Sequence, residues 1–407
     1  MSILSIVSVI LFIFGIILLL IIMLFSRNSN LPKKRNEGYS FCIMIPARYE
    51  SSVIATLLES IKNQSFKINM SDVYVIVESK SDPTVNICKN FGASIVIRKK
   101  LDLKTKGYAL DEGVKYILSK KKKYTAYFIF DADNILDKDY IKNMIPVFDK
   151  GYDLASGYRN AKNGNASSVA ASSALTFSLI NEVFNRIKCN KTKNITFSGT
   201  GFYIRGYLIE KFKGYPFTSL TEDYELSCYA TLNDLTTYYN DKSIFYDEQP
   251  VKYKNTINQR VRWIKGYFNV RKKYSFKIFK SISKSSNNNG SKIDESIGIL
   301  PYLFMVLSLC LYFVNLLLNL IISVFIKNYI KGILPIIIFF VVVYILLLIL
   351  TIILLIIENK KINLNVKTKI KTLFVNPLYI ISYIPCALQA LFKKDIKWSV
   401  VNHGDSK

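Results

Sequence analysis

Three long, uncharged apolar runs constrain the fold of this 407-residue chain most strongly. They occupy residues 1–26, 297–326 and 332–357. Each is long enough to cross the roughly 30 Å hydrocarbon layer of a bilayer as a helix. The first run lacks a basic segment before it and a small-residue cleavage site after it, so we interpret it as a retained anchor, not a signal peptide. The other two runs, joined by the short polar link 327–331, predict a transmembrane hairpin.

Basic residues flanking these runs predict the topology. Lysines and arginines follow the first run and the third run, which favours the cytoplasmic side of the plasma membrane for both flanks. A fourth apolar stretch, 372–392, contains two prolines, an asparagine and a glutamine, so it crosses, re-enters or lies in the interface. Lys393, Lys394 and Lys397 favour a cytoplasmic C-terminus and therefore disfavour a full fourth crossing.

The predicted organisation of this multi-pass protein has five parts. They are an anchor (1–26), a cytoplasmic domain (27–270), an interfacial basic helix and linker (271–296), a transmembrane hairpin (297–357), and a basic loop with a membrane-associated segment and tail (358–407).

The formal net charge of +26 does not indicate a nucleic-acid partner, because the lysines are spread along the chain instead of clustered in one patch. Membrane lipids are the expected partner of this basic surface. The six cysteines show no C-x-x-C spacing, so neither a zinc site nor a disulfide framework is predicted. The single histidine, His403, receives no catalytic role.

The cytoplasmic part alternates short β-rich runs with helix-like stretches. The runs FCIMIPA, VYVIVES, SIVIRK and AYFIFDADN are separated by helical patterns, which predicts an α/β fold with a largely parallel sheet. Ligands bind beyond the carboxyl ends of strands in such sheets. Polar residues follow three of these strands, at 47–50, 78–82 and 131–134, and we expect them to meet in one crevice.

Asp131 and Asp133 stand one residue apart where a buried strand ends. Two carboxylates on such a turn can bind a hard divalent cation, Mg²⁺ or Mn²⁺, that also binds substrate phosphates. The alternative is that they cap the following helix. Further motifs follow in order: FSGTGFYIR from Phe197, TED at 221–223, and QRVRW at 259–263.

The order and spacing of D-x-D, T-E-D and Q-x-x-R-W resemble the family 2 glycosyltransferases, which include cellulose, hyaluronan, chitin and poly-N-acetylglucosamine synthases. The resemblance extends from about residue 41 to 267. It implies a GT-A fold, a Rossmann-like mixed sheet that binds nucleotide sugars. It also implies an inverting glycosyltransferase that extends a β-linked polysaccharide from a UDP-sugar such as UDP-GlcNAc or UDP-glucose. The alternative is transfer of a single sugar to a polyprenyl-phosphate or glycolipid acceptor.

The resemblance also assigns roles to residues. Asp131 and Asp133 would hold the metal ion against the donor diphosphate, and Asp223 would be the general base. The nucleotide would be bound by Glu78, which replaces the usual aspartate, with Asp82 and Lys106. The acceptor or product would be bound by Gly199, Thr200, Gly201, Glu222, Gln259, Arg260, Arg262 and Trp263.

Simpler interpretations of these motifs remain open. Lys106 could be a solvated lysine at a helix start, and Asp223 could be a first-turn carboxylate that the helix dipole favours. Q-x-x-R-W could belong to an amphipathic interfacial helix. A transporter is disfavoured because the three apolar runs contain no ionisable residue. An inactive homologue is disfavoured by the intact motifs. Three or four spans are few for a polymer channel, so export would call for a homo-oligomer or a partner.

Overall fold

The computed structural model describes residues 2–25, 31–35, 37–282 and 287–393. Lys394, Lys397 and His403 lie outside the described residues, as does part of the predicted linker.

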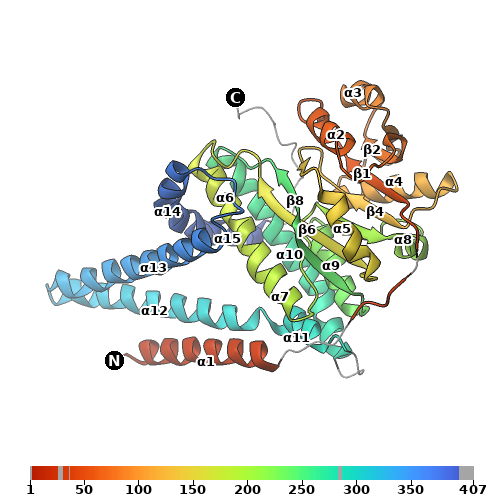
Figure 1. Ribbon diagram of the computed structural model, residues 1–407. Coiled ribbons are helices and arrows are strands. Elements are labelled where there is room, and N and C mark those ends of the chain that lie inside the picture. The colour runs from red at the N-terminus through yellow and green to blue at the C-terminus, as the bar shows by residue number, and fades with distance from the viewer. Residues whose placement is uncertain (1, 26–30, 36, 283–286, 394–407) are drawn as a thin grey trace.

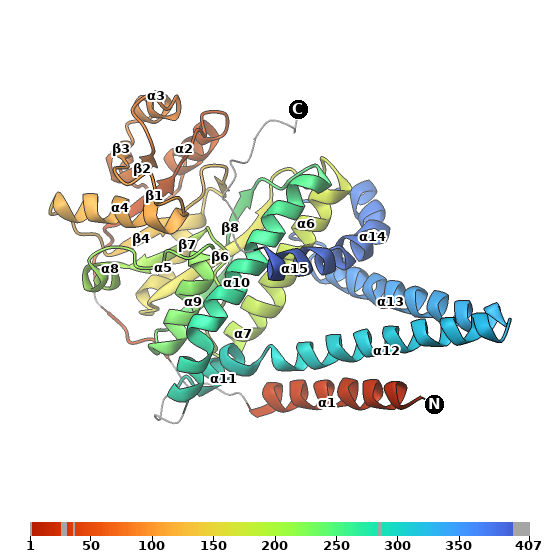
Figure 2. The same cartoon turned by 180° about the vertical axis from the view of Figure 1, so that it is seen from behind.

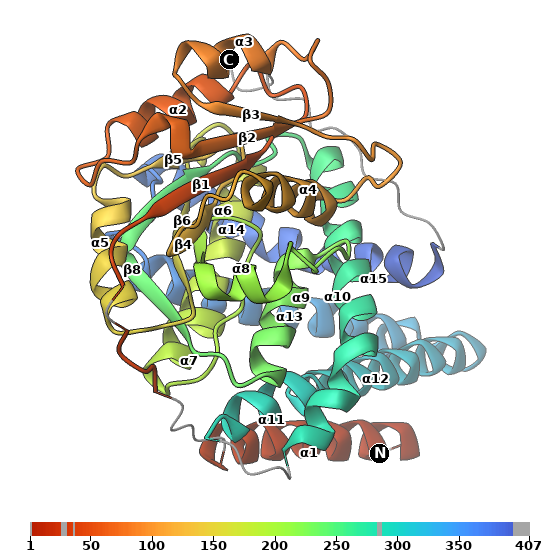
Figure 3. The same ribbon diagram turned by 90° about the vertical axis from the view of Figure 1, so that its right-hand side faces the viewer.

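One mixed sheet forms the centre of the globular part of the molecule (Figure 3). It has eight strands in the order β3-β2-β1-β4-β7-β6-β8-β5. The neighbours β3, β2, β1 and β4 are parallel, whereas β7 is antiparallel to both of its neighbours. The strands are β1 Phe41–Pro46, β2 Val73–Val77, β3 Ser94–Ile97, β4 Ala126–Ile129, β5 Ile135–Leu136, β6 Leu154–Ala161, β7 Phe202–Arg205 and β8 Thr237–Asp247. The predicted α/β class is confirmed, and the antiparallel β7 makes the sheet mixed.

Helices cover both faces of this sheet. They are α2 Ile54–Lys62, α3 Thr84–Asn90, α4 Lys106–Ser119, α5 Tyr140–Asp149, α8 Gly206–Phe212 and α9 Glu222–Leu232, with the 3₁₀ turn η1 at Met70–Asp72. The central strand β1 shows why the sheet is sandwiched. Its Ile43 and Ile45 belong to an apolar cluster with α2 and α5, and Cys42 and Met44 to a second cluster with α4. Because successive side chains point to opposite faces, a continuous apolar strand must be covered on both.

Three long apolar helices project together from one side of the sheet domain (Figure 1). They are α1 Ile3–Phe25, α12 Leu300–Phe325 and α13 Tyr329–Ile357. The helices α1 and α12 pack closely at Gly15. A Cβ added there would lie 2.9 Å from the carbonyl oxygen of Pro301, so only glycine fits without a shift. Across the same interface Ser308 Oγ donates to the Ser8 carbonyl at 2.6 Å.

Four helical segments of the described chain are long and apolar enough to span a membrane: Ile3–Ile22, Asn289–Phe325, Tyr329–Ile357 and Val366–Phe392. The fourth segment consists of α14 Val366–Ile381 and α15 Tyr383–Phe392, which meet at Ser382. It packs against the helices of the sheet domain as well as against α13 (Figure 2).

Two elements differ from the predicted boundaries. The helix α10, Tyr253–Ser281, is continuous across residue 270, where the sequence analysis ended the cytoplasmic domain. Q-x-x-R-W and the basic stretch after it therefore share one helix. The predicted linker also contains a helix, α11 Asn289–Ile297.

An unpredicted helical segment lies between the sheet and the apolar helices. It consists of α6 Ser168–Leu179, the π-helical η2 Ile180–Arg186 and α7 Ile187–Asn190. Ala171 and Leu175 of α6 pack with Leu354 of α13, so this segment joins the sheet domain to the base of the hairpin. A π-helical turn of this kind often occurs at functional sites.

Candidate active site

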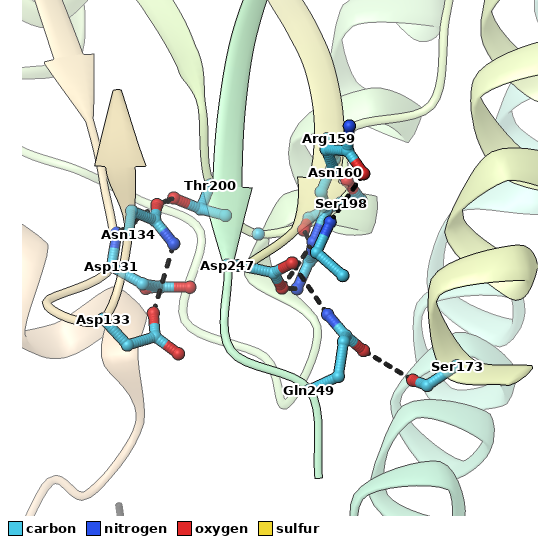
Figure 4. Close-up of polar contacts among 12 residues, drawn as sticks. Asp131, Asp133, Asn134, Arg159, Asn160, Ser173, Ser198, Thr200, Asp247 and Gln249 are labelled. Carbon is cyan, nitrogen blue, oxygen red and sulfur yellow. Dashed lines mark hydrogen bonds and ion pairs between the residues drawn. The ribbon is translucent and has the colours of Figure 1, made fainter. Parts of the chain in front are cut away.

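The D-x-D turn follows directly from the buried strand β4. The backbone N–H of Asp131 donates to Thr200 Oγ at 2.9 Å and to Asn134 Oδ1 at 3.1 Å. Asn134 is fully buried, and its side-chain amide donates to Asp133 Oδ1 at 3.1 Å. Figure 4 shows the Asp131 carboxylate pointing toward the side on which Asp247 lies, whereas one oxygen of the Asp133 carboxylate accepts from Asn134. Asn134 and Thr200 therefore position the turn, and Thr200 itself is buried and does not line the cavity described below.

Lys106 lies opposite this turn, at the first position of α4. Its Nζ forms an ion pair with Asp131, donates to the Gly199 carbonyl at 2.6 Å and lies 3.9 Å from Glu222 Oε1. Burial opposes the charge of Lys106, but Asp131 and Glu222 outweigh it and raise the pKa of the lysine. A half-buried, charged lysine in this position suits a phosphate-bearing ligand.

The T-E-D motif begins α9 and places two carboxylates on the same cavity. Burial and the neighbouring Asp223 raise the pKa of Glu222 to about 8, although Lys106 opposes the shift. Burial also raises the pKa of Asp223, while the Tyr224 N–H, Lys106 and Arg159 act in the opposite direction. The Tyr224 N–H donates to Asp223 Oδ1 at 2.8 Å. An aspartate with a raised pKa is a better proton acceptor than an exposed one.

The two glycines of FSGTG are required for different structural reasons. Gly199 has a φ of +90°, and a Cβ there would lie 3.6 Å from Asp223 Oδ2. It therefore keeps the space beside this carboxylate open. Gly201 does not line the cavity, and a Cβ there would lie 2.1 Å from the ring of Phe245. A glycine is therefore needed at position 201 for packing in the core, and not for contact with an acceptor.

Gln259, Arg262 and Trp263 of α10 line the same cavity as the D-x-D and T-E-D motifs. Burial lowers the pKa of Arg262, and the nearby carboxylates of Glu222, Asp131 and Asp223 act against that shift. The buried Nε of Arg262 has no hydrogen-bond partner among the described residues. A guanidinium that lines the cavity and has a buried, unused donor fits an anionic ligand group. Trp263 meets Phe177 edge to face, with ring centroids 5.9 Å apart.

Arg260, two residues before Arg262, lies on the other side of α10. It is fully buried and lies between the rings of Tyr379 and Tyr383, with its guanidinium carbon 4.5 and 4.7 Å from their centroids. Its Nη1 donates to Ser382 Oγ at 2.7 Å. The structure therefore does not bring Arg260 to the cavity with the other predicted residues. Positions i and i+2 point to different sides of a helix, which explains the difference.

The two predicted nucleotide-side acids also separate. Glu78 lines the cavity and pairs with Arg48 at 2.9 Å and with Arg98 at 3.5 Å. Asp82 is buried and does not line it. Its carboxylate accepts from the N–H groups of Tyr49 at 2.9 Å and Thr84 at 2.8 Å, so it holds the loop after β1 in place.

A second charged group, which was not predicted from the sequence, lies at the ends of β6 and β8. Arg159 Nε donates to Asp247 Oδ2 at 2.8 Å, and Arg159 Nη1 donates to the Ser198 carbonyl at 2.6 Å (Figure 4). Gln249 Nε2 donates to the other carboxylate oxygen of Asp247 at 2.7 Å. The polar run DEQ at 247–249 follows a strand with alternating apolar residues, and it could have indicated this group. Like D-x-D, it stands at the carboxyl end of a strand, where ligands bind in such sheets.

One cavity of about 820 Å³ connects these groups. Of the predicted site residues it is lined by Glu78, Lys106, Asp131, Asp133, Gly199, Glu222, Asp223, Gln259, Arg262 and Trp263. The strand ends expected to meet in one crevice do so at Ala47, Glu78 and Asp131. Its polar end thus places carboxylates, a lysine and arginines around a single space.

The donor set of the D-x-D turn suits a divalent cation that is shared with a ligand. Two carboxylates on one turn provide hard oxygen atoms, as Mg²⁺ and Mn²⁺ prefer. Within the described residues, no group of three or more His, Cys, Asp and Glu side chains is arranged to hold a metal. The residues therefore fit a cation that takes its remaining ligands from phosphate oxygens and water, not a closed protein site.

Fold and site together define a nucleotide-sugar-type glycosyltransferase domain of the GT-A fold, joined to helices of membrane length. The profile of the family described as "Glycosyltransferase like family 2" matches residues 39–266. That match covers more than half of the chain, and the protein belongs to this family.

The known proteins that are similar to the chain include a curated relative and a solved structure. The probable glycosyltransferase YdaM of Bacillus subtilis (strain 168) is 26% identical over 279 residues, which are 63% of this chain and 62% of YdaM. The match thus spans less than two thirds of that relative. The mannosyltransferase PcManGT from Pyrobaculum calidifontis, solved with GDP-Man and Mn²⁺, superposes with a TM-score of 0.56 at 12% identity. The superposition covers 96% of this chain and all of PcManGT, and it shows the shared GT-A fold.

Proposed function

We propose that this protein transfers a sugar from a nucleotide sugar to an acceptor hydroxyl at the membrane, with inversion of configuration. The observation that carries the proposal is the convergence of Asp131, Asp133, Lys106, Asp223 and Arg262 on one cavity. These groups supply, in one place, the cationic and metal-binding contacts that a diphosphate needs and a carboxylate that can accept a proton.

The donor would be bound at the polar end of the cavity. Lys106 and Arg262 would contact the diphosphate, and Asp131 and Asp133 would hold Mg²⁺ or Mn²⁺ against it. The metal ion, when bound, neutralises charge on the departing nucleoside diphosphate. The complex of PcManGT with GDP-Man and Mn²⁺ supports a divalent metal and a nucleotide-sugar donor in this fold. Glu78 and its arginine partners would lie beside the nucleoside, and the motif resemblance favours UDP.

Asp223 would act as the general base. The acceptor oxygen attacks the anomeric carbon, the bond from that carbon to the diphosphate breaks, and the hydroxyl proton passes to Asp223. One displacement inverts the anomeric centre, so an α-linked donor gives a β-linked product. Glu222, beside Asp223 and Lys106, and the open space at Gly199 would receive the acceptor.

The presence of Q-x-x-R-W supports a growing β-linked polysaccharide as the acceptor, with poly-N-acetylglucosamine as the first choice. The charge distribution supports a cytoplasmic site at the plasma membrane. Export of such a polymer would call for a homo-oligomer or a partner. The second candidate is transfer of one sugar to a polyprenyl-phosphate or glycolipid.

The test is the size of the product. Purified protein in nanodiscs is supplied with radiolabelled UDP-sugars and Mn²⁺, and the labelled product is sized on a gel. A high-molecular-weight product supports the polysaccharide, and a single-sugar product supports the lipid acceptor. If the protein consumes none of the nucleotide sugars, the proposed function is overturned.

A further inference from the structure

Asp223 stands in the first turn of α9, and contacts with other elements decide where this turn lies. Thr221 occupies the N-cap position, and its side chain makes no capping hydrogen bond in the described part of the chain. The first N–H groups of a helix have no partner within the helix itself. A helix that starts without a side-chain cap therefore depends on neighbouring elements to fix its first turn.

One neighbouring element is the loop before β7, which carries the FSGTG motif. Ser227 Oγ donates to the Asp223 carbonyl at 3.0 Å and accepts from the Phe197 N–H at 2.9 Å. Ser227 is buried, so this contact is shielded from water. The serine therefore ties the first turn of α9 to the loop on one side.

The contact on the other side is made by Tyr224, the residue next to the proposed base. Its hydroxyl donates to the Glu295 carboxylate of α11, and its backbone N–H donates to Asp223 Oδ1 at 2.8 Å. Burial and the Glu295 carboxylate raise the pKa of Tyr224, so its hydroxyl keeps the proton and remains a donor. Tyr224 thus connects the Asp223 carboxylate to a carboxylate on a different helix.

Arg271 of α10 lies against the same tyrosine and the same carboxylate. Its Nη1 donates to the hydroxyls of Tyr224 and Tyr267, each at 3.2 Å, and lies 3.9 Å from Glu295 Oε1. Its Nη2 donates to the Ser296 carbonyl at 2.9 Å. The rings of Tyr224 and Tyr267 stack with their centroids 4.6 Å apart. Because charge-assisted hydrogen bonds are the stronger ones, the guanidinium fixes the Tyr224 hydroxyl against Glu295.

This network is buried beside the proposed site of sugar transfer. Tyr224 and Glu295 are both buried, and both line the same cavity as Asp223. Buried ion pairs add little net stability, because the cost of desolvation offsets their attraction. A buried hydrogen-bond network does define one arrangement of the groups that it joins. Its main effect here is on the geometry of the first turn of α9.

The helix α11 joins the network to the long apolar helices. The helices α10 and α11 both lie beside α9 (Figure 3). Glu295 is in the last turn of α11, and α12 begins at Leu300. The segment Asn289–Phe325, which includes both helices, is long and apolar enough to span a membrane. Glu295 therefore connects Asp223, through Tyr224, to a helix of membrane length.

We propose that Glu295, Arg271 and Tyr224 are positioning residues, which hold the first turn of α9 so that the Asp223 carboxylate faces the acceptor hydroxyl. This inference rests on the proposed function and names the residues that orient its base. Glu295 and Arg271 act through the Tyr224 hydroxyl, and Tyr224 acts through its N–H on Asp223. Loss of the network should lower the maximal rate and leave donor binding unchanged, because the proposed donor contacts are outside it.

The first experiment is a double-mutant cycle on the bond between Tyr224 and Glu295. Tyr224→Phe removes the hydroxyl but keeps the ring and the backbone N–H, and Glu295→Gln removes the charge but keeps the shape. Each protein, in nanodiscs of total lipid extract from its source cells, receives Mn²⁺ and the UDP- or GDP-sugar that the wild type consumes fastest. Release of nucleoside diphosphate is measured over a range of donor concentrations.

We expect each single variant to lose roughly 10-fold in maximal rate at an unchanged donor KM, since a small misplacement of a reacting group has effects of this size. The double variant should lose no more than either single variant, because both changes break one bond. A double variant that loses the product of the two single losses would overturn the inference. Wild-type protein that consumes no donor would instead overturn the proposed function.

The apparent Tm and the donor Kd separate a positioning role from a purely structural one. A positioning role predicts a lower maximal rate with the donor Kd unchanged and only a small change in Tm. A maximal rate that falls together with the Tm and with donor binding would show general destabilisation of the domain, and the inference would be wrong.

Variants of Arg271 and a matched tyrosine complete the test. Arg271→Lys keeps a charged donor and should retain more of the maximal rate than Arg271→Gln. Tyr229→Phe is the control for Tyr224→Phe, because Tyr229 is also on α9 but packs its ring against Phe212 and Phe217. It should keep the wild-type maximal rate. Equal losses in Tyr229→Phe and Tyr224→Phe, or a wild-type rate in Arg271→Gln, would contradict the inference.

Discussion

Lys106 Nζ forms an ion pair with Asp131, the first carboxylate of the D-x-D turn. The same amine donates to the Gly199 carbonyl, so one lysine connects the proposed metal site to the loop beside Asp223. A cation at this position competes with a metal ion for Asp131 and attracts a diphosphate.

Lys106→Met should therefore separate metal binding from donor binding. Without the competing amine, Mn²⁺ alone should bind more tightly. Loss of a hydrogen bond to a charged group costs about 1.5–3 kcal/mol, so the nucleotide sugar should bind roughly 10- to 100-fold more weakly. Isothermal titration with Mn²⁺ and then with donor measures both. Lys115→Met, at an exposed lysine paired with Asp111, is the control. Unchanged donor affinity in Lys106→Met would remove the lysine from the donor site.

Asp223→Asn should abolish turnover without weakening donor binding. General base catalysis contributes about 10²- to 10⁴-fold, so we expect a loss of that order in kcat. The base must be deprotonated to act, and burial raises the pKa of Asp223 above its ordinary value of 3.8. The activity of the wild type should therefore decline with falling pH at a higher pH than an exposed aspartate would give. A kcat in Asp223→Asn equal to that of the wild type would exclude Asp223 as the base.

Glu222 should make the stability of the protein depend on pH. Its pKa is raised from 4.5 to about 8, so the folded state binds the proton more tightly than the unfolded state. Stability is then lost as the pH rises between these values, and above about 8 the buried charge carries its full cost. Glu222→Gln should raise the apparent Tm at pH 8.5, with a smaller difference at pH 5. Thermal unfolding in detergent measures this, with Glu210→Gln as an exposed control. Equal Tm differences at both pH values would argue against the shift.

Arg260 and Arg262 should give opposite results although they are two residues apart. Arg262→Gln removes a guanidinium from the cavity, so the donor Kd should rise at least 10-fold with little change in Tm. Arg260→Gln breaks the contacts of α10 with Tyr379, Tyr383 and Ser382. It should lower the apparent Tm by several degrees and leave the donor Kd unchanged. Weaker donor binding in Arg260→Gln at full stability would contradict the separation.

Much of the sheet domain could be predicted from the sequence. The apolar runs of β1 to β4 are continuous because these strands are covered on both faces, and their polar ends mark the cavity. The resemblance to the family motifs singled out Asp131, Asp223 and Arg262, and the structure brings all three to one cavity. The local sequence pattern was sufficient to predict a site residue wherever the same strand or helix supplied both the apolar periodicity and the functional side chain.

The remaining features depend on contacts between distant segments. Asp82 and Asp131 both follow buried strands, but only the fold shows that Asp82 accepts from the Tyr49 N–H and is buried. Arg260 belongs to a motif, yet its environment is formed by Tyr379, more than 100 residues away. The apolar part of the cavity lining could not be predicted either, because Leu19, Phe184 and Tyr302 come from three separate parts of the chain.

Metal-dependent release of nucleoside diphosphate tests the central claim most directly. The purified protein in nanodiscs is incubated with a panel of UDP- and GDP-sugars, with Mn²⁺, Mg²⁺ or EDTA, beside Asp131→Asn and Asp223→Asn variants. We predict release from at least one donor with a divalent metal, loss of release with EDTA, and loss in both variants. Release that persists with EDTA and in both variants, or release from no donor, would contradict a metal-assisted glycosyltransferase site at this cavity.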